Sequence, residues 1–95
     1  MAIVWDPVKA RTNRDKHGVE FRDAAEIFGG PTIQFPDRRR EYREDRTRAI
    51  GRVGGRVLLV VFVRRGADIR LISARPASQE ERERYETATS DFDES

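Results

Sequence analysis

The stretch RTRAIGRVGGRVLLVVFVRRGADIRLISAR, residues 46–75, establishes the fold class, because it predicts three consecutive β-strands. Polar and apolar side chains alternate along residues 46–53, as they do in a strand with one solvated face. Gly54-Gly55 then predicts a two-residue hairpin turn, since both positions tolerate a positive φ. The run VLLVVFV at 57–63 has no polar face, so it predicts a central strand that is covered on both sides. Alternation resumes in residues 68–75, which predict the third strand.

Two helices are expected on the N-terminal side of these strands. The first runs over residues 7–17, between a capping Asp6 and a terminating Gly18. The second runs from about Glu20 to Phe28, and its apolar residues recur at the spacing of a buried helical stripe: Phe21, Ala24, Ala25 and Phe28.

The remaining elements are short strands at 2–5 and 32–35 and a C-terminal helix over 78–88. The segment Ser78-Gln79-Glu80-Glu81 opens that helix with a capping box, in which the serine and the last glutamate bond each other's backbone amides. The order strand–helix–helix–strands–helix predicts an α+β fold. Its small antiparallel sheet would carry two N-terminal helices and one C-terminal helix.

The composition excludes several classes of site. The 95 residues include no cysteine and one histidine, which rules out disulfides, thiolate metal sites and histidine-rich metal sites, and we expect no cofactor. The N-terminus MAIVWDP has no basic region followed by an apolar run, so it predicts no secretion signal. The longest apolar run is too short to span a bilayer as a helix. We therefore expect a cytoplasmic protein without a membrane partner.

The charges are unevenly distributed, although the formal net charge is only +2. Between Arg38 and Arg75 twelve arginines stand against four acidic residues, whereas residues 89–95 carry three acids and no base. This pattern indicates a face that binds a polyanion, in a domain formed by residues 1–88 and followed by an acidic, disordered tail at 89–95. An arginine-rich genome is the alternative explanation, but it accounts for the choice of arginine over lysine and not for the clustering.

The only histidine, His17, lies beside Lys16 and directly before the glycine that ends the first helix. Lys9, Asn13 and His17 are spaced at i, i+4 and i+8, so they share one face of that helix. A cation in the last turn of a helix is favoured by the macrodipole. An imidazole is also suited to proton transfer near neutral pH. The residues themselves leave the structural and the catalytic interpretation open.

Several arginines are candidates for contacts with phosphate groups. Arg46 and Arg48 would share one face of the first long strand, and Arg64, at the end of the central strand, would reach that face through strand pairing. Arg70 and Arg75 lie in an otherwise apolar strand, where a charge needs a partner or a ligand. The alternatives are a solvated turn for Arg64 and, for Arg75, an ion pair with one of the first glutamates of the last helix.

The ordered motifs WDP (5–7), KHGV (16–19), ISAR (72–75) and ERERYE (81–86) resemble the BrnT toxins of bacterial toxin–antitoxin pairs. The intervening segments fit the same pattern through Lys9, Asn13, the stripe of the second helix, Asp45-Arg46 and Gly51. The resemblance extends from about Val4 to Glu86.

This resemblance implies a ribonuclease fold like that of RelE, with helices packed on one side of a small antiparallel sheet. It implies an endoribonuclease toxin that cleaves RNA and inhibits translation and growth. It also implies neutralisation by a BrnA-like antitoxin, in a hetero-oligomer that binds operator DNA through the antitoxin.

Metal-independent cleavage of RNA needs a base for the 2′-hydroxyl proton, an acid for the leaving 5′-oxygen and cations around the phosphorane. One histidine cannot supply both proton-transfer groups, so the available partners of His17 are Lys16, Glu80 and Tyr85, with base and acid unassigned. Arg75 is the candidate for stabilising the phosphorane. Two other classes of function use the same arginines: a non-enzymatic nucleic-acid-binding module, and a protein-interaction module that binds an acidic partner.

Overall fold

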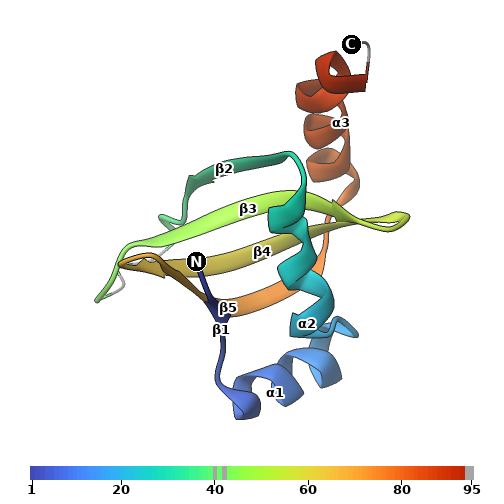
Figure 1. Ribbon diagram of the computed structural model, residues 1–95. Helices are drawn as coiled ribbons and strands as arrows, with labels where there is room; N and C mark the ends of the chain where they lie inside the picture. The colour runs from blue at the N-terminus through green and yellow to red at the C-terminus, as the bar shows by residue number, and fades with distance from the viewer. Residues whose placement is uncertain (40, 42, 94–95) are drawn as a thin grey trace.

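The computed structural model describes residues 1–39, 41 and 43–93, with side chains described as far as Ser90. The elements follow the predicted order and confirm the α+β class (Figure 1). They are β1 (Ile3–Val4), α1 (Pro7–His17), α2 (Phe21–Ala24), the 3-10 helix η1 (Ala25–Gly29), β2 (Thr32–Pro36), β3 (Arg46–Val53), β4 (Arg56–Arg65), β5 (Asp68–Pro76) and α3 (Gln79–Asp93).

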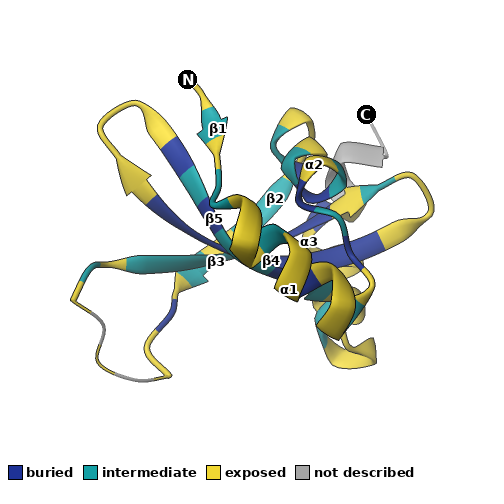
Figure 2. Cartoon of the chain, turned by 90° about the horizontal axis from the view of Figure 1, so that it is seen from below, coloured by how far each residue is buried: buried dark blue, intermediate teal, exposed yellow. Residues whose placement is uncertain are grey.

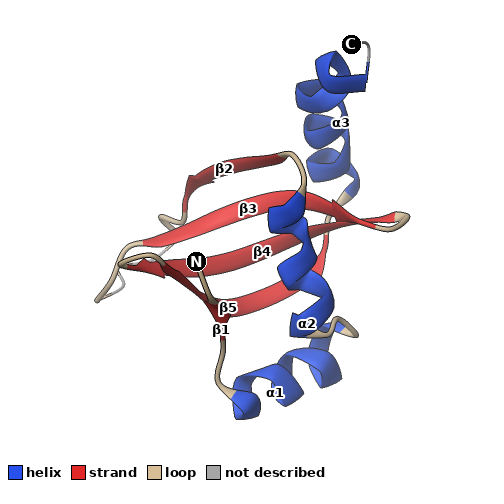
Figure 3. Cartoon of the chain, viewed as in Figure 1, coloured by secondary structure: helices blue, strands red, loops and turns tan. Residues whose placement is uncertain are grey.

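The strands form one sheet in the order β1-β5-β4-β3-β2 (Figure 3). The pairs β2–β3, β3–β4 and β4–β5 are antiparallel, and β1 alone pairs in parallel, with the start of β5. Every side chain from Val57 to Val63 on β4 is buried, which confirms that this run forms a central strand covered on both faces. The hairpin between β3 and β4 pairs Val53 with Arg56, and Gly54 adopts a positive φ of 58°.

One face of the sheet packs against α1, α2 and η1. Phe21, Ala24 and Ile27 recur every three residues and are all fully or almost fully buried. This spacing differs from the predicted stripe because the second half of the helix is 3-10, in which residues i and i+3 lie above one another. The core on this face is completed by Val19, Ala49, Leu58, Val60, Phe62, Ile69, Leu71 and Ala74.

Gly51 allows η1 to approach the sheet closely. A Cβ atom at this position would lie 2.6 Å from the Cβ of Ile27 and 3.1 Å from its Cγ2. Real Cβ contacts are not that short, so only glycine fits here without moving the helix or the strand.

The C-terminal helix packs on the opposite face, at the end of the sheet from which it projects in Figure 1. Tyr85 is its main buried residue and joins Ile50, Val57 and Leu59 of the sheet. The predicted helix end near residue 88 is wrong, because α3 continues to Asp93. No glycine or proline interrupts this segment, and Thr89 is buried with its hydroxyl donating to the Tyr85 carbonyl at 2.8 Å. Residues 89–93, predicted to be a disordered tail, are therefore helical, and residues 94–95 lie outside the described part.

The first helix, α1, is mostly exposed, as the yellow colour of its ribbon in Figure 2 shows. Its ends confirm the predicted caps: the Asp6 carboxylate accepts a hydrogen bond from the Val8 amide at 2.8 Å, and Gly18 ends the helix at φ 70°. Its single buried residue is Asn13. Among the described residues, no helix is both long enough and apolar enough to cross a membrane.

Candidate active site

The sheet face opposite α1 and α2 carries a set of cations that we call the arginine face, made of Arg46, Arg48, Arg70 and Arg75. Strand register places them together. Arg46 and Arg70 both pair with Val63, Arg48 pairs with Val61, and Arg75 pairs with Leu59. Directly paired residues project to the same side of a sheet, and adjacent strands lie about 5 Å apart. The arginine face therefore surrounds the apolar side chains of β4, and Ser73 joins it opposite Val61.

Two of these arginines are held close to the sheet. The Arg48 guanidinium lies 4.5 Å from the ring centre of Phe35, a cation–π contact across the β2–β3 pair. Its Nε atom lies 3.9 Å from a carboxylate oxygen of Asp37. Arg46 forms an ion pair with Glu44, whose Oε1 lies 3.9 Å from Arg46 Nη2. Both guanidinium groups are about three-quarters buried, so neither moves as freely as a surface arginine.

Asn13 attaches the end of α1 to the edge of β5. Its side-chain Nδ2 donates to the carbonyls of Val19 at 3.0 Å and Ala74 at 2.8 Å, and its Oδ1 accepts from the Ala74 amide at 3.0 Å. The side-chain amide thus bonds Ala74 as a neighbouring strand would, beyond the point where β1 has ended. Asn13 therefore bonds buried backbone, and it holds the end of α1, which carries Lys16 and His17, against β5.

Lys16 and His17 line a depression between α1 and β5 that we call the α1 hollow. Its other lining residues are Val8, Lys9, Thr12, Asn13, Ile72 and Ser73. The predicted shared face of Lys9, Asn13 and His17 is therefore correct. His17 is half-buried and Lys16 is exposed. The predicted helix end at His17 is also confirmed, because the Gly18 amide donates to the Arg14 carbonyl at 2.8 Å.

A second depression, the loop hollow, adjoins the first. It is lined by Lys16, Arg39, Glu41, Arg43, Arg46, Ile72 and Ser73. Lys16, Ile72 and Ser73 line both hollows, so the two hollows meet at these three residues. Among the described residues that line it, the loop hollow carries four cationic side chains against one carboxylate.

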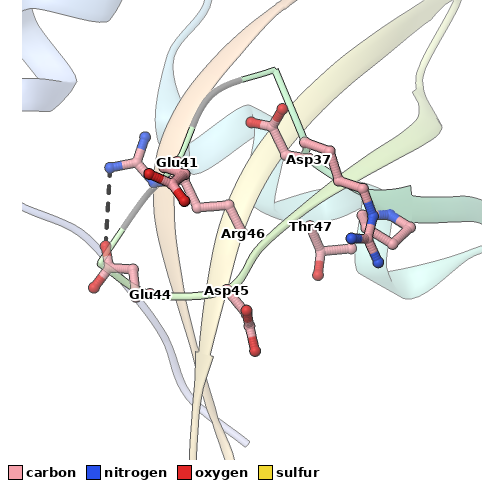
Figure 4. Close-up of a pocket in the computed structure, with 8 residues that line it drawn as sticks. Asp37, Glu41, Glu44, Asp45, Arg46 and Thr47 are labelled. Atoms are coloured by element: carbon pink, nitrogen blue, oxygen red, sulfur yellow. Dashed lines mark ion pairs between the residues drawn. The ribbon is translucent and has the colours of Figure 1, made fainter.

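A third depression borders the segment that joins β2 and β3 and is shown in Figure 4. We call it the acidic hollow, because half of the described residues that line it are acidic, namely Asp37, Glu41, Glu44 and Asp45, although the Asp37 side chain is not exposed. Arg46 contributes to both the acidic and the loop hollow, and Figure 4 shows its guanidinium turned toward Glu44. A polyanion is repelled by the acidic hollow, so the loop hollow is the better site for phosphate. Among the described residues, no group of three or more histidine and carboxylate side chains is arranged to hold a metal ion.

Arg75 is engaged with the start of α3. Its Nη1 and Nη2 atoms donate to the two carboxylate oxygens of Glu81 at 2.8 and 3.0 Å. Glu81 also accepts from the Ser78 amide at 2.8 Å, which confirms the predicted capping box. Burial acts to raise the pKa of Glu81, but the hydrogen bonds from Arg75 and Ser78 and the Arg75 charge outweigh it, and the pKa lies below its ordinary value. Of the two interpretations of Arg75, the ion pair is therefore present in the structure.

Two other predicted proton-transfer residues lie away from the hollows. The Tyr85 side chain is buried, and its hydroxyl donates to the Pro31 carbonyl at 2.8 Å. Glu80 is exposed on α3, with its carboxylate 4.0 Å from Arg84. Neither residue lines the α1 hollow or the loop hollow, which leaves Lys16 as the predicted partner that adjoins His17.

The prediction that Arg64 reaches the same face as Arg46 and Arg48 is wrong. Arg64 follows Leu58, Val60 and Phe62 in the alternation of β4, so it projects from the helix-covered face, where its Nη2 donates to Gln34 Oε1 at 3.1 Å. Arg70 is on the arginine face, but it lines a separate depression beside β1 with Arg65 and Asp68.

Sequence reasoning missed Asp37 and Ser73. Asp37 follows the last residue of β2, and its carboxylate is completely buried against Arg39. An aspartate two residues before an arginine, directly after a strand, is typical of a side chain that bonds the backbone of a turn, and this was the available signal. Ser73 lies on the arginine face because it is two residues from Arg75 on β5, and a bulge between Ser73 and Leu71 brings Arg70 to the same face. The sequence carries no distinct signal for that bulge.

Comparison with known proteins gives one family. A family model described as the ribonuclease toxin, BrnT, of a type II toxin–antitoxin system matches residues 5–81, which include α1, the whole of β2 to β5 and the start of α3. No curated protein matches the chain.

Proposed function

Because the chain belongs to the BrnT family of ribonuclease toxins of type II toxin–antitoxin systems, we propose that its RNA substrate binds across the loop hollow and the α1 hollow. The family identity confirms the resemblance found in the sequence and makes the protein an enzyme with an RNA substrate and a cognate antitoxin. The proposal concerns where the RNA lies and which side chains act on it.

The observation that carries this proposal is the junction of the two hollows at Lys16 and Ser73. On one side of the junction lie the arginines of the loop hollow, which attract phosphate. On the other side lies His17, the only side chain of the chain whose ordinary pKa is near neutrality. A ribose–phosphate unit placed over the junction would meet both kinds of group.

The proposed reaction is an attack of the ribose 2′-oxygen on the adjacent phosphorus. The new bond joins the 2′-oxygen to phosphorus while the bond from phosphorus to the 5′-oxygen breaks, leaving a 2′,3′-cyclic phosphate and a 5′-hydroxyl end. One proton leaves the 2′-hydroxyl and one is delivered to the 5′-oxygen. His17 and Lys16 form the proton-transfer pair, without an assignment of base and acid. No step requires a metal ion, so cleavage should continue in the presence of a chelator.

Arg46 and Arg48 stabilise the negative charge that accumulates on the phosphorane oxygens. Arginine suits this role because its planar guanidinium donates to two oxygens at once. The burial of both side chains reduces the motion that must be lost when phosphate binds. Arg75 contributes less directly, because Glu81 already accepts two of its hydrogen bonds.

The test is cleavage of a labelled RNA by the purified toxin with a chelator present. His17→Ala should lower kcat/KM by about a hundredfold or more, and Lys16→Ala should lower it as well. Arg11→Ala is the matched control, since Arg11 is an exposed cation on the same helix that lines neither hollow. Loss of activity with the chelator, or equal activities for the Arg11 and His17 variants, contradicts the proposal.

Arg46→Ala and Arg64→Ala form a second matched pair. Both remove one positive charge at an end of the β3–β4 pair, but only Arg46 projects into the loop hollow. A charge-assisted hydrogen bond of about 1.5–3 kcal/mol corresponds to a loss of roughly 10- to 100-fold in kcat/KM for the Arg46 variant. The Arg64 variant should remain within about threefold of wild type. Equal losses would indicate that only the total charge matters.

The partner proposed is a BrnA-like antitoxin whose acidic side chains cover the loop hollow and compete with RNA. The hetero-oligomer binds operator DNA through the antitoxin. Arg46→Ala should then weaken both RNA cleavage and antitoxin binding, and the toxin alone should not shift operator DNA in a gel. Induced expression should arrest growth unless the antitoxin is produced with it. An antitoxin that binds the Arg46 variant as tightly as wild type would place the interface elsewhere.

A further inference from the structure

The buried carboxylate of Asp37 joins the segment after β2 to the arginine face. Its side chain has no exposed area, although it carries a carboxylate and contacts Arg39, which lines the loop hollow. A buried carboxylate is costly unless cations and hydrogen bonds compensate it. The compensation includes Arg39, which lies in the segment between β2 and β3, and Arg48, which lies on β3. Asp37 Oδ1 and Oδ2 accept from Arg39 at 2.7 and 2.9 Å, and Arg48 Nε lies 3.9 Å from Oδ1.

The pair with Arg39 fixes both a backbone turn and a guanidinium plane. The Arg39 amide also donates to Asp37 Oδ1 at 3.4 Å, so one carboxylate oxygen receives the backbone and the side chain of the same residue. Two parallel hydrogen bonds prevent the guanidinium from rotating. About half of the Arg39 side chain (51%) nevertheless remains exposed, and it lines the loop hollow with Lys16 and Arg46.

Arg48 is held from two directions. The Cζ atom of Arg48 lies 4.5 Å from the ring centre of Phe35, and its Nε atom lies near the Asp37 carboxylate. That Nε is buried and has no hydrogen-bond partner among the described residues. Since Asp37 contacts both arginines through the same oxygen, a shift of the carboxylate would move both.

We infer that Asp37 is a positioning residue, which orients Arg39 toward a phosphate group in the loop hollow and holds Arg48 on the arginine face beside Arg46. This inference rests on the proposed RNA site. Groups ordered before the substrate arrives do not have to be ordered by it, which favours the transition state when the orientation is the productive one. Asp37 itself, being negative and buried, does not touch the RNA.

A positioning role predicts that Asp37→Asn slows RNA cleavage without weakening RNA affinity. Asp37→Asn removes a negative charge beside the RNA, so simple electrostatic attraction predicts equal or tighter binding. Positioning predicts slower cleavage, because the amide cannot accept two hydrogen bonds from Arg39 and places an NH₂ group against it. A non-cleavable 2′-O-methyl RNA measures affinity separately, and single-turnover cleavage of RNA measures the rate of the bound complex.

The expected result for Asp37→Asn is an affinity within about twofold of wild type, or tighter, and a single-turnover rate lowered roughly tenfold or more. Asp45→Asn is the matched control: it makes the same charge change in the same segment, at an exposed residue of the acidic hollow. This control should cleave at the wild-type rate. An Asp37→Asn variant that cleaves as fast as the Asp45 variant overturns the inference.

If Asp37→Asn does not fold, a second pair of variants tests whether Asp37 positions Arg39. Arg39→Lys keeps the charge but loses the two-pronged contact, and Arg38→Lys makes the same exchange at an exposed neighbour. The Arg39 variant should be slowed roughly as much as Asp37→Asn, whereas the Arg38 variant should not. Combining Arg39→Lys with Asp37→Asn should add little further loss. Equal rates for the two lysine variants overturn the inference.

Failure of the RNA site itself has a different signature. If Arg46→Ala and Arg64→Ala cleave alike, the proposed site is wrong, and the role of Asp37 falls with it. If Arg46→Ala is impaired while Asp37→Asn cleaves normally, the site stands and only the positioning role is excluded.

Discussion

Replacing Asn13 by alanine should destabilise the protein more than any other single change on α1. The Asn13 side chain makes three hydrogen bonds of 2.8–3.0 Å to backbone groups of Val19 and Ala74, and it is only 5% exposed. Alanine leaves two carbonyls and one amide without these partners. Each buried polar group that loses its partner costs about 1–3 kcal/mol. Three such groups set an upper limit of about 9 kcal/mol, and water entering beside the shortened side chain reduces this to about 3–5 kcal/mol.

The assay is thermal unfolding followed by circular dichroism. For a domain of this size each kcal/mol shifts the midpoint by about 4–8 °C, so the Asn13→Ala midpoint should fall by at least about 12 °C. Thr12→Ala is the matched control, because the exposed Thr12 hydroxyl bonds only the Val8 carbonyl of its own helix, at 3.1 Å. Its expected cost is below about 1 kcal/mol. If the Asn13→Ala and Thr12→Ala proteins have the same unfolding midpoint, the buried hydrogen bonds of Asn13 do not stabilise the fold as argued.

Two further readouts separate the lost hydrogen bonds from the lost volume. Asn13→Asp keeps the acceptor for the Ala74 amide but turns a second oxygen toward two carbonyls, so at neutral pH it should be destabilised as strongly as Asn13→Ala. Its midpoint should rise when the pH is lowered, because a neutral carboxyl group can donate one bond. Cleavage by both variants should fall even below their unfolding midpoints, because Asn13 also holds Lys16 and His17 beside Ser73.

Three shorter predictions follow from other contacts. Gly51→Ala should lower the free energy of unfolding by about 1–3 kcal/mol in urea, because its Cβ would lie 2.6 Å from Ile27; no change would mean that η1 moves away without cost. Glu81→Gln should remove the part of the acid sensitivity that Glu81 causes. The pKa of Glu81 is lowered in the fold, so its stabilising effect is complete above its unfolded pKa near 4.5 and is lost as the pH falls through the lower folded value. Urea titrations from pH 7 to pH 3 that remain parallel for wild type and variant would exclude this. Tyr85→Phe should cost about 0.5–1.5 kcal/mol of stability through the lost hydroxyl bond and leave the cleavage rate unchanged; a slowed variant of wild-type stability would restore Tyr85 as a catalytic candidate.

The central strands were predictable because their sequence directly encodes burial. Alternation over residues 46–53 and the apolar run at 57–63 reproduce the bounds of β3 and β4 within two residues. The first helix was equally clear, since capping chemistry at Asp6 and Gly18 is local. The fold class follows from the order of these elements, which the structure confirms.

The sheet face from which Arg64 projects could have been predicted from the β3–β4 register that the Gly54-Gly55 turn sets. A two-residue turn at Gly54-Gly55 pairs Val53 with Arg56, and counting back along both strands pairs Arg46 with Val63. Arg64 then projects from the opposite face to Arg46. The register predicted from the sequence therefore places Arg64 on the face opposite Arg46. The prediction was wrong because it considered only that both residues lie near strand ends.

The remaining features depend on contacts between distant segments. Tyr85 became a catalytic candidate because phenols can transfer protons, but its hydroxyl is 54 residues away in sequence from the Pro31 carbonyl that it bonds. Nothing in the local pattern of α3 indicates that contact. Likewise, Asp37 is buried because β3 brings Arg48 beside it, and a carboxylate in an arginine-rich segment otherwise predicts an exposed ion pair.

The ion pairs hold the arginines with different strengths, because their carboxylates differ in burial and in distance. Arg75 and Arg39 donate two short hydrogen bonds each to Glu81 and Asp37, whose side chains are 17% and 0% exposed. Removing an arginine from such a carboxylate leaves a buried charge unpaired, at a cost of several kcal/mol. Arg46 meets Glu44 at 3.9 Å, and that carboxylate is 34% exposed, so water can solvate it when the pair separates. We therefore expect Arg39 to bind a phosphate in the loop hollow while it is still attached to Asp37. Replacing Glu81 or Asp37 by a neutral residue should therefore change the position of its arginine more than replacing Glu44 changes that of Arg46.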